Sequence, residues 1–319
     1  MDSHAAPIDV SVGQIAMCVC VPARNEARRL PVLLDSLAAQ DWAEPVSVCI
    51  AINNSTDDSI AVMEAMRQRH ADRLVLHVEK AGFPPELAHA GSARRMAMDA
   101  GLAVLGSANG AILVSTDADT RPPPEWLSSI AAQFVNGADL VGGRLEIDPL
   151  EPLSPPVLRL RQAWDRYWAA VRAIEDEIDP LAWDPSPRHG DHTGASLAIR
   201  AAIYRACGGV PLMPTGEDRA LVNAALATGA RLVHPDSVYT YVSPRLEGRA
   251  AGGMATAMQD LRDAADNQAV LMAPSFEHWR ARAKWRREMR SLPGGHALIS
   301  RHEPLLPPMP CDMPIGIGV

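Results

Sequence analysis

The sequence predicts an α/β protein built on a mostly parallel sheet with helices on both faces. Short apolar runs recur four times through residues 15–115, and stretches with helical spacing separate them. The runs are almost continuously apolar, which is typical of strands buried on both faces. With 319 residues, of which 47% are hydrophobic, the chain can bury a large core.

The first half of the chain alternates predicted strands and helices. The predicted strands are residues 15–21, 46–52, 74–78 and 111–115. The predicted helices are residues 26–39, 58–70 and 92–105. Ligands of such sheets bind outside the carboxyl ends of the strands. We therefore expect the site in the polar residues that follow three of the strands, at 22–26, 53–57 and 117–120.

The second half begins with a predicted helix at 125–134 and a strand at 138–147. The breaker-rich stretch 148–156 is the expected boundary between subdomains. Further helices are predicted at 157–177, 201–206, 218–228 and 277–289, and extended segments at 193–199 and 231–242. The tail, 304–319, is rich in Pro, Met and Gly, and we expect it to pack poorly or to lie over another surface.

Charge and composition limit the classes of protein to which this chain can belong. The formal net charge of −8 argues against a nucleic-acid-binding protein that works by bulk electrostatics. The five cysteines lack zinc-finger spacing and are interpreted as buried thiols of a reducing compartment. The start of the chain lacks the pattern of a signal peptide, and no run approaches ~18 apolar residues. We expect a soluble, cytoplasmic protein.

The pair Asp117 and Asp119 directly follows the apolar strand 111–115. Two carboxylates at this edge of a sheet suit a hard divalent metal such as Mg²⁺ or Mn²⁺, which in turn would hold a diphosphate. An ordinary turn or helix cap explains the same pair. The pair thus indicates, without proving, an enzyme that handles a nucleotide-activated donor.

The loops after the first two strands offer groups for the rest of such a donor. Arg24 could meet a diphosphate, and Glu26 could accept a hydrogen bond from a ribose hydroxyl. Asn53 and Asp57 could read the edges of a nucleobase. Either loop is also explained as a capped helix entry. Arg94 or Arg95, at the start of a later helix, could face the diphosphate, and the other would be a solvated arginine.

Three further groups of candidate site residues lie later in the chain. Glu217 and Asp218 begin a helix, where a carboxylate could take a proton from an acceptor hydroxyl or merely form an acidic first turn. Arg245, together with Arg249, suits a loop that closes over phosphates, or a charged surface loop. His192 and His234 could complete a metal shell, although such histidines are more often hydrogen-bonded core or surface groups.

Taken in order, these motifs resemble those of the family 2 glycosyltransferases, which have the GT-A fold. The likeness spans about residues 15–250. The segments that carry it are 20–26, 53–57, 91–95, 117–119 and 216–218. The resemblance implies a GT-A-type Rossmann-like mixed sheet flanked by helices, a helical acceptor-side region and a C-terminal helical extension. It divides the chain into a nucleotide-sugar-binding half (1–148), an acceptor-binding half (149–250) and an extension with a Pro-rich tail (251–319).

The resemblance also assigns roles to particular residues. The nucleotide pocket would be lined by Pro22, Arg24, Glu26, Asn53 and Asp57. Asp117 would touch the ribose or the metal, and Asp119 would ligate Mg²⁺ or Mn²⁺. Asp218 would be the general base with Glu217 beside it, which suits a single in-line displacement with inversion.

The chain departs from the family pattern at identifiable positions. It has Ile52 where many members have an aspartate in the second-strand motif. It also lacks the late histidine of the metal shell in the region 238–243, so the third metal ligand is unassigned. The processive members carry a Gln-x-x-Arg-Trp motif and membrane helices, and neither is present here. We therefore expect the transfer of a single sugar.

The partners expected from the sequence are a nucleoside diphosphate sugar and an unidentified small or lipid-linked acceptor. Rival functions are a retaining glycosyltransferase, a nucleotidyltransferase and a non-catalytic nucleotide-sugar-binding protein. The basic helix that carries Arg280 and Arg290 is compatible with peripheral contact to an anionic membrane and equally with a solvated helix face. A homodimer is also compatible with the sequence.

Overall fold

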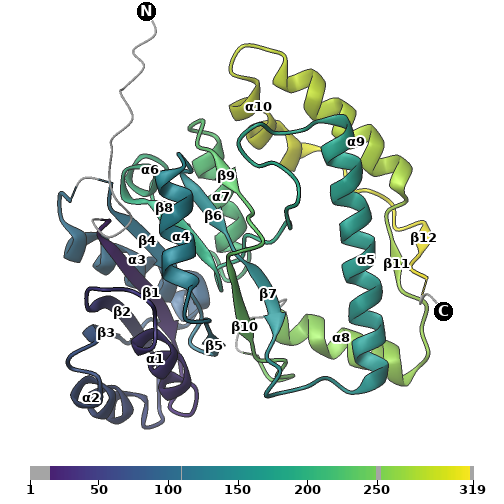
Figure 1. The fold of residues 1–319 in the computed structure, drawn as a ribbon. Helices are drawn as coiled ribbons and strands as arrows, with labels where there is room; N and C mark the ends of the chain where they lie inside the picture. The colour runs from purple at the N-terminus through teal and green to yellow at the C-terminus, as the bar shows by residue number, and fades with distance from the viewer. Residues whose placement is uncertain (1–14, 109, 249–252, 317–319) are drawn as a thin grey trace, which may run out of the picture.

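The computed structural model describes residues 15–108, 110–248 and 253–316. Within these residues the centre is a mixed sheet of seven strands in the order β3-β2-β1-β4-β8-β6-β9 (Figure 1). The strands are β1 (Met17–Ala23), β2 (Val46–Asn53), β3 (Leu74–Ala81), β4 (Ile112–Ser115), β6 (Leu140–Gly142), β8 (Leu197–Arg200) and β9 (Leu232–Val233). β1 runs parallel to β2 and β4, whereas β8 is antiparallel to β4 and β6. The predicted mixed sheet is confirmed.

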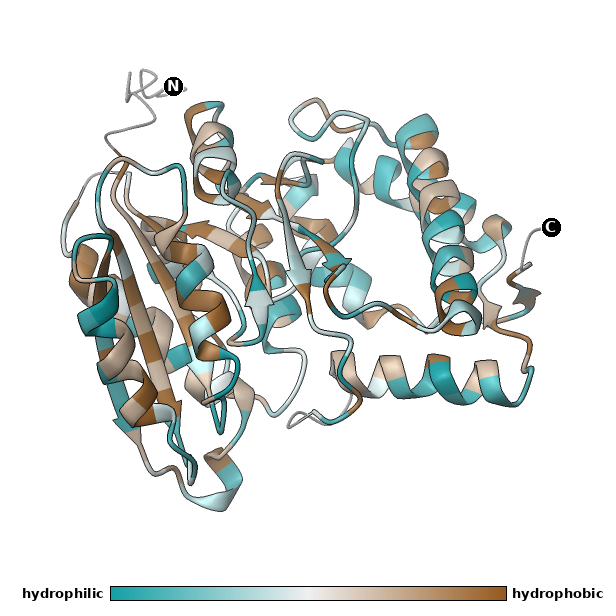
Figure 2. Cartoon of the chain, turned by 60° about the horizontal axis from the view of Figure 1, so that its bottom comes forward, coloured by the Kyte–Doolittle hydropathy of each residue, from teal (hydrophilic) through white to brown (hydrophobic). Residues whose placement is uncertain are grey.

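Helices cover both faces of the large sheet, as the sequence predicts. One face packs on α1 (Leu30–Ala38), α2 (Ser59–Arg69) and α4 (Trp126–Val135). The other packs on α3 (Ala90–Leu105), α6 (Ala201–Ala206) and α7 (Glu217–Leu226). Figure 2 shows hydrophobic residues gathered on the strands and on the adjoining helix surfaces. Because the strands are buried on both faces, their sequences are almost continuously apolar.

Successive side chains of β1 point to opposite faces of the large sheet. Val19 and Val21 lie in one core cluster, and Cys18 and Cys20 lie in the other. The Sγ atom of Cys18 lies 3.5 Å from the Sγ atom of Cys49 on the neighbouring strand, and all these thiols are free and buried. The expectation of buried thiols is therefore confirmed for the strand cysteines. It is wrong for Cys207, which is only partly buried, and for Cys311, which is exposed.

The predicted strand 138–147 is two strands that belong to different sheets. After β6, the chain enters β7 (Arg144–Ile147), which pairs with β10 (Tyr239–Val242) in a smaller sheet of order β5-β10-β7, where β5 is Thr120–Arg121. The switch occurs at Gly142 and Gly143. A Cβ atom on these residues would lie 2.2 Å from the Asp191 carbonyl oxygen and 2.0 Å from Ser196 Oγ, respectively. Glycine therefore lets the chain that precedes β8 approach the sheet closely.

A helical layer stands beside the sheets (Figure 1). It consists of α5 (Pro155–Ile178), α8 (Met254–Asp266), α9 (Phe276–Arg290) and α10 (Gly295–His302), with the short strand pair β11 (Met272–Ala273) and β12 (Met313–Pro314). Two 3₁₀ turns, η2 (Pro85–Leu87) and η3 (Glu303–Leu305), complete the described elements. The sequence did not predict α8, α10 or the strand pair.

The long helix α5 joins this layer to the rest of the chain. Its Val157 and Leu160 pack on Met258 and Leu261 of α8. Further along, Tyr167 packs with Ile315 of the tail. The end of the described tail thus packs against α5 through Met313 and Ile315, whereas most of residues 304–312 are exposed. Residues 1–14, Arg249 and the last three tail residues, which enter predictions above, lie outside the described residues.

The arginines of α9 form ion pairs inside the molecule. Arg286 contacts Glu175 of α5 and Glu303 of η3, with nitrogen–oxygen distances of 2.6 Å to each, and Arg290 contacts Asp179 at 2.7 Å. Glu175 is only 5% exposed. These pairs give the basic helix a structural role. No described helix combines the length and apolarity needed to cross a membrane.

We expect Arg286→Ala to lower the free energy of unfolding by about 3 kcal/mol, because it leaves the buried carboxylate of Glu175 without its partner from α9. Chemical denaturation followed by circular dichroism measures this. Arg280→Ala on the same helix is the control, because Arg280 and its partner Glu177 are 48% and 69% exposed. That change should stay within about 0.5 kcal/mol. Equal effects of the two substitutions would contradict the anchoring role of Arg286.

Candidate active site

The candidate site lies where the predicted loops meet, at the carboxyl ends of β1, β2 and β4. These strands are adjacent and parallel, so the loops that follow them converge on one edge. Pro22 lies on β1 itself, opposite Ala51 of β2. Asn53 ends β2 and is buried, with its side-chain amide 3.3 Å from the Asn54 Oδ1 atom. Arg24 donates to the Ala88 carbonyl oxygen at 3.2 Å.

The first two loops are tied to each other by side chains. Asn25 has a left-handed backbone (φ 52°), and its Oδ1 atom accepts a hydrogen bond from the Thr56 backbone N–H at 2.7 Å. Its own backbone N–H donates to Ser55 Oγ at 2.9 Å. The backbone N–H of Glu26 donates to Ser59 Oγ at 3.0 Å. These bonds fix the direction of the Glu26 side chain.

Asp57, predicted for the nucleotide pocket, takes part in the same ties. Its carboxylate accepts hydrogen bonds from the Ala27 N–H at 3.0 Å and from the Ser59 N–H at 3.1 Å. Although partial burial acts to raise the pKa of Asp57, the bonds from Ser59 and Ala27 lower it overall. Asp57 therefore ties the loop after β1 to the start of α2.

Arg94 connects the two carboxylate pairs of the prediction. Its Nη2 atom lies 2.8 Å from Asp117 Oδ1, and its Nε atom lies 3.0 Å from Glu217 Oε1. Its Nη1 atom donates to Ser115 Oγ at 2.7 Å and to the Gly194 carbonyl oxygen at 2.9 Å. These partners come from three separate segments of the chain: the end of β4 with its loop, the segment before β8 and the start of α7.

The guanidinium of Arg94 is buried, with its side chain 6% exposed. Burial acts to lower its pKa, but the negative charges of Asp117, Glu217 and Asp218 raise it above the ordinary value. The sequence interpretation put Arg94 against a diphosphate. The structure places it beneath the site, where it holds Asp117 and Glu217 in register with each other.

Asp119 pairs with Arg245, not with the Arg94 that holds Asp117. Its Oδ2 atom lies 2.8 Å from Arg245 Nε. The same guanidinium donates to both carboxylate oxygens of Glu26, at 2.9 and 3.2 Å. Arg245 thus links the loop after β10 to the loops after β1 and β4. The sequence assigned Glu26, Asp119 and Arg245 to the same donor site, but it did not predict that they contact one another.

The carboxyl group of Asp119 has a raised pKa of about 6. Burial is the main cause, and the nearby charges of Asp117 and Glu26 act in the same direction, against the opposing charge of Arg245. Three acidic residues therefore crowd one small volume, with Arg245 in contact with two of them. Such crowding is typical of a place that holds an additional cation.

Asp218 lies at the start of α7, half-buried, with its side chain turned toward the segment before β8. Its Oδ2 atom accepts a hydrogen bond from the Gly194 N–H at 2.8 Å, and Oδ1 accepts from the Arg219 N–H at 2.7 Å. Gly216, with φ 76°, makes the turn into the helix. Asp218 is thus held by backbone donors, whereas buried Glu217 is held by Arg94.

The two histidines that the sequence suggested as metal ligands bond to each other. His192 Nδ1 lies 3.1 Å from His234 Nε2, and His234 Nδ1 lies 2.8 Å from Asp184 Oδ2. Among the residues described, no group of three His, Cys, Asp or Glu side chains is arranged to hold a metal ion. The third protein ligand therefore stays unassigned.

The acidic pair nevertheless fits a hard divalent metal. Asp117 and Asp119 supply carboxylate oxygens, and their mutual repulsion is felt in the raised pKa of Asp119. Mg²⁺ is commonly bound by one or two carboxylates together with substrate phosphates and water, so a larger protein cage is not required. Asp117 and Asp119 are the residues that would hold Mg²⁺ or Mn²⁺ here.

Several residues of the site were not found from the sequence. Gly194 carries both a carbonyl acceptor for Arg94 and an N–H donor for Asp218, and a Cβ atom there would lie 2.3 Å from Arg94 Cζ. Glu151 pairs with Arg29 and accepts from Ser243 Oγ at 2.9 Å beside the Arg245 loop. The only sign of these residues in the sequence was Gly194, a glycine inside the segment 193–199 that is predicted to be extended.

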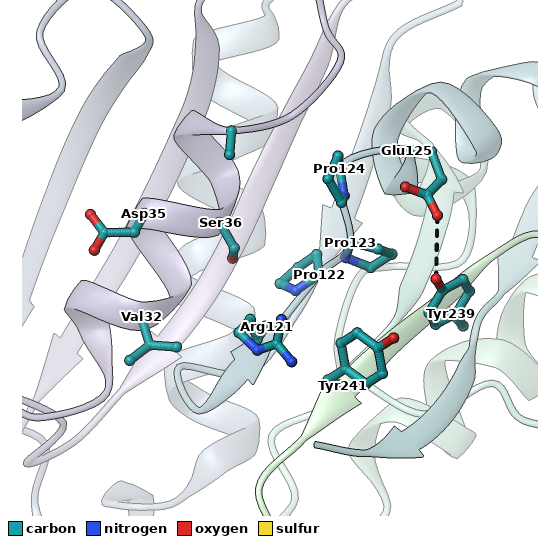
Figure 3. A pocket seen from close by; sticks show the side chains of 11 residues that line it. Val32, Asp35, Ser36, Arg121, Pro122, Pro123, Pro124, Glu125, Tyr239 and Tyr241 are labelled. Atoms are coloured by element: carbon teal, nitrogen blue, oxygen red, sulfur yellow. Dashed lines mark hydrogen bonds between the residues drawn. The ribbon is translucent and has the colours of Figure 1, made fainter. Parts of the chain in front are cut away.

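A separate cavity of about 560 Å³ lies between α1 and β10. Figure 3 shows Tyr239, Tyr241, the proline run 122–124 and Glu125 on one side, with Val32, Asp35 and Ser36 of α1 on the other. None of the predicted site residues lines it. The cavity is therefore distinct from the candidate active site.

Comparison with solved structures shows what this fold is similar to. TarS from S. aureus (residues 1–349), solved with UDP-GlcNAc, superposes with a TM-score of 0.54 at 18% identity, over 91% of this chain and 72% of that one. The mannosyltransferase PcManGT from Pyrobaculum calidifontis, solved with GDP-Man and Mn²⁺, gives a TM-score of 0.50 at 17% identity, over 91% of this chain and 79% of that one. At these identities the likeness shows the fold, which is that of GT-A glycosyltransferases.

Part of the sequence also matches a family model. The model of glycosyl transferase family 2 matches residues 18–168, which include β2, β4 and the Asp117–Asp119 pair. The match covers less than half of the chain, and it shows that this part of the sequence is similar to that family. A comparison with curated protein sequences found no match.

The raised pKa of Asp119 makes a prediction about stability. The folded state binds this proton more tightly than the unfolded chain does, because the pKa rises from 3.8 to about 6. Stability is therefore lost as the pH rises from about 4 to about 6, by up to about 3 kcal/mol. We expect Asp119→Asn, without added metal, to be more stable than the parent protein at pH 8 and similar to it at pH 4, as measured by urea unfolding.

Asp57→Asn is the matched control, with the opposite sign. Because the pKa of Asp57 is lowered, its carboxylate stabilises the fold at neutral pH, and the substitution should destabilise the protein at pH 8. If Asp119→Asn also destabilised the protein at pH 8, the crowding of acidic charge inferred for this site would be wrong.

Proposed function

We propose that the chain transfers one sugar from a nucleoside diphosphate sugar to an acceptor hydroxyl, in a metal-dependent reaction with inversion at the anomeric carbon. The observation that carries the proposal is the buried Arg94, which holds Asp117 at the metal edge and Glu217 beside Asp218. The rigid guanidinium of Arg94 thereby fixes the distance between Asp117, which would meet the donor, and Asp218, which would meet the acceptor.

The donor side is formed by the loops after β1, β2 and β4. Pro22, Arg24 and Asn53 line the edge for the nucleoside, and Glu26 is placed for a ribose hydroxyl. Asp117 and Asp119 hold Mg²⁺ or Mn²⁺, which when bound supplies positive charge to the leaving diphosphate. Solved proteins of this fold bind UDP-GlcNAc and, together with Mn²⁺, GDP-Man, which supports a nucleotide-sugar donor.

Arg245 provides a second positive charge at this edge. In the structure it neutralises Glu26 and Asp119. With Asp119 engaged as a metal ligand, Arg245 would be able to donate to the diphosphate, for which its fork of N–H donors is well suited. This exchange of partners agrees with the role that the sequence assigned to Arg245.

Asp218 is the proposed general base. Backbone N–H groups fix its two oxygens, each of which keeps a free lone pair for an acceptor hydroxyl. The acceptor oxygen attacks the anomeric carbon as its proton passes to Asp218, and the bond to the diphosphate breaks. A single displacement of this kind inverts the anomeric centre. A small or lipid-linked acceptor, a cytoplasmic location, membrane contact and a homodimer stay predictions.

The proposal predicts release of nucleoside diphosphate from one member of a nucleotide-sugar panel in the presence of Mn²⁺ or Mg²⁺, with water as the acceptor. Asp218→Asn should lower kcat by about 10²–10⁴ and leave the donor KM nearly unchanged, because a lost base affects the transition state. Asp119→Ala should abolish turnover through loss of metal and donor. Glu125→Gln, in the separate cavity, is the control and should keep the parent activity.

The products distinguish the rival functions. Retention at the anomeric carbon would indicate a retaining enzyme, and pyrophosphate in place of nucleoside diphosphate would indicate a nucleotidyltransferase. Donor binding with no turnover, with or without acceptors, would indicate a binding protein. Each of these results would contradict the proposal.

A further inference from the structure

The cavity between α1 and β10 takes no part in the roles assigned above. Its volume of about 560 Å³ lies within the range of about 300–1,000 Å³ that is typical of small-molecule sites. Figure 3 shows aromatic, proline and charged side chains that face one another across it. The chemistry of this lining limits the class of molecule that fits the cavity.

Two tyrosines of β10 supply the aromatic part of the lining. Tyr239 and Tyr241 are two positions apart on the strand, so both side chains point to the same side of the small sheet. Thr240, which lies between them, is fully buried on the opposite side. The two ring centroids are 5.6 Å apart, and the ring planes are inclined by 82°. The rings therefore form two walls of the cavity at nearly a right angle.

Neighbouring side chains hold both rings in place. Arg121 of β5 pairs in register with Tyr241, and its Cζ atom lies 4.6 Å from the centroid of that ring. Two contacts with Asp148, at 2.7 and 2.8 Å, fix the Arg121 guanidinium. The Tyr239 hydroxyl donates a hydrogen bond to Glu125 Oε1 at 3.2 Å. The rings are thus preorganised, which lowers the entropic cost of binding a ligand.

The other walls are formed by the proline run 122–124 and by α1. The pyrrolidine rings fix the φ angles of the prolines, so this wall is rigid. From α1, Asp35 and Ser36 bring polar groups to the cavity, and Val32 brings an apolar one (Figure 3). Asp35 Oδ1 lies 2.7 Å from His70 Nε2. A carboxylate can accept several hydrogen bonds, so this contact leaves Asp35 able to accept from a ligand hydroxyl.

The charges of the lining disfavour an ionic ligand. An anion would meet the carboxylates of Asp35 and Glu125. Arg121 would not offset them, because Asp148 already engages its guanidinium. A cation would meet Arg121 at the face of the Tyr241 ring, which already holds this positive charge. The lining therefore suits a neutral ligand.

A sugar is a neutral ligand whose surface matches this lining. Its hydroxyl groups can pair with Asp35, Ser36 and the tyrosine hydroxyls, which an apolar ligand would leave without partners. Its C–H faces can pack on the tyrosine rings. Burial raises the pKa of Tyr239 to about 12, with Tyr241 and Glu125 acting in the same direction, so the Tyr239 hydroxyl stays neutral at physiological pH.

The strands of the lining, β5 and β10, also border the donor edge. Thr120 of β5 pairs with Val242 of β10. Thr120 directly follows Asp119, and the loop that follows Val242 carries Arg245. Arg245 in turn contacts Asp119 at 2.8 Å. A saccharide held in the cavity would therefore lie near the edge where the proposed donor binds.

We propose that this cavity is a binding site for a neutral saccharide, separate from the transfer site, in which Tyr239 and Tyr241 pack against sugar rings and Asp35 accepts from sugar hydroxyls. Arg121 and Glu125 position the tyrosine rings. The inference goes beyond the proposed function and does not depend on it, because saccharide binding can be measured without donor, metal or turnover. Donor hydrolysis, in which water is the acceptor, does not use the cavity.

The first test titrates the full chain with maltose, cellobiose, lactose and N,N′-diacetylchitobiose by isothermal calorimetry, without metal or donor. We expect at least one of these sugars to bind, and Tyr241→Ala to weaken that binding at least about tenfold through the loss of an aromatic wall. Trp168→Ala is the matched control, because it removes an exposed aromatic ring from α5, outside the cavity. It should bind like the parent. Binding of none of these sugars, or equal losses in the two variants, would overturn the proposal.

The second test fills the cavity and leaves the tyrosines in place. Val32 is 42% exposed on α1, so Val32→Trp should fold like the parent, as circular dichroism would show. Its indole should block the cavity and abolish saccharide binding. Inorganic phosphate and choline, added to the parent as an anionic and a cationic competitor, should not displace the sugar. Competition by either ion, or unchanged binding in Val32→Trp, would contradict the proposal.

The third test separates this site from the transfer site. Asp218→Asn should bind the saccharide like the parent, because Asp218 does not line the cavity. Loss of binding in Asp218→Asn, with binding kept in Tyr241→Ala, would place the sugar at the transfer site and overturn the proposal. A parent that turns over no donor but binds saccharide through Tyr241 refutes the proposed function alone. A parent that turns over donor and binds no saccharide refutes this inference alone.

Discussion

The buried guanidinium of Arg94 is the interaction on which the candidate site depends. It joins Asp117, in the loop after β4 that would hold the metal, to Glu217, at the start of the helix that carries the proposed base Asp218. A buried arginine needs several acceptors to offset the cost of its desolvation, and here they come from β4 and the loop after it, from α7 and from the segment before β8. The two halves of the site therefore cannot move independently without leaving a buried charge unpaired.

Charge balance explains the remaining polar contacts. Asp119 and Glu26 bring two more carboxyl groups to the metal edge, and Arg245 is the cation that contacts both. A metal and a diphosphate would replace these contacts by others of matching charge. The side of the site near Asp218 differs, because Asp218 is held by the backbone N–H groups of Gly194 and Arg219. The site thus combines a highly charged edge around Asp119 with a carboxylate at Asp218 that backbone donors hold.

The sequence predicted the α/β sheet and its flanking helices because apolar periodicity is a local property of each segment. It also predicted the loops that hold Asp117, Asp119 and Asp218, since each follows a recognisable strand or begins a helix. It could not predict contacts that only the tertiary fold creates. The burial of Arg94, its contact with Gly194 and the hydrogen bond between His192 and His234 join segments far apart in the chain. Nor did the sequence predict α8 or the strands β11 and β12, because strands of two residues are too short to show a periodic pattern.

The most direct test of this account is the nucleoside diphosphate release rate of Arg94→Lys. Lysine keeps the positive charge but cannot contact Asp117, Glu217 and Gly194 at once, because it has one nitrogen in place of a planar fork. If Arg94 fixes the two edges of the site relative to each other, the variant should fold and bind donor yet release nucleoside diphosphate at least about a hundredfold more slowly, since small misplacements cost about that much. A folded Arg94→Lys variant with the parent rate would contradict the central claim.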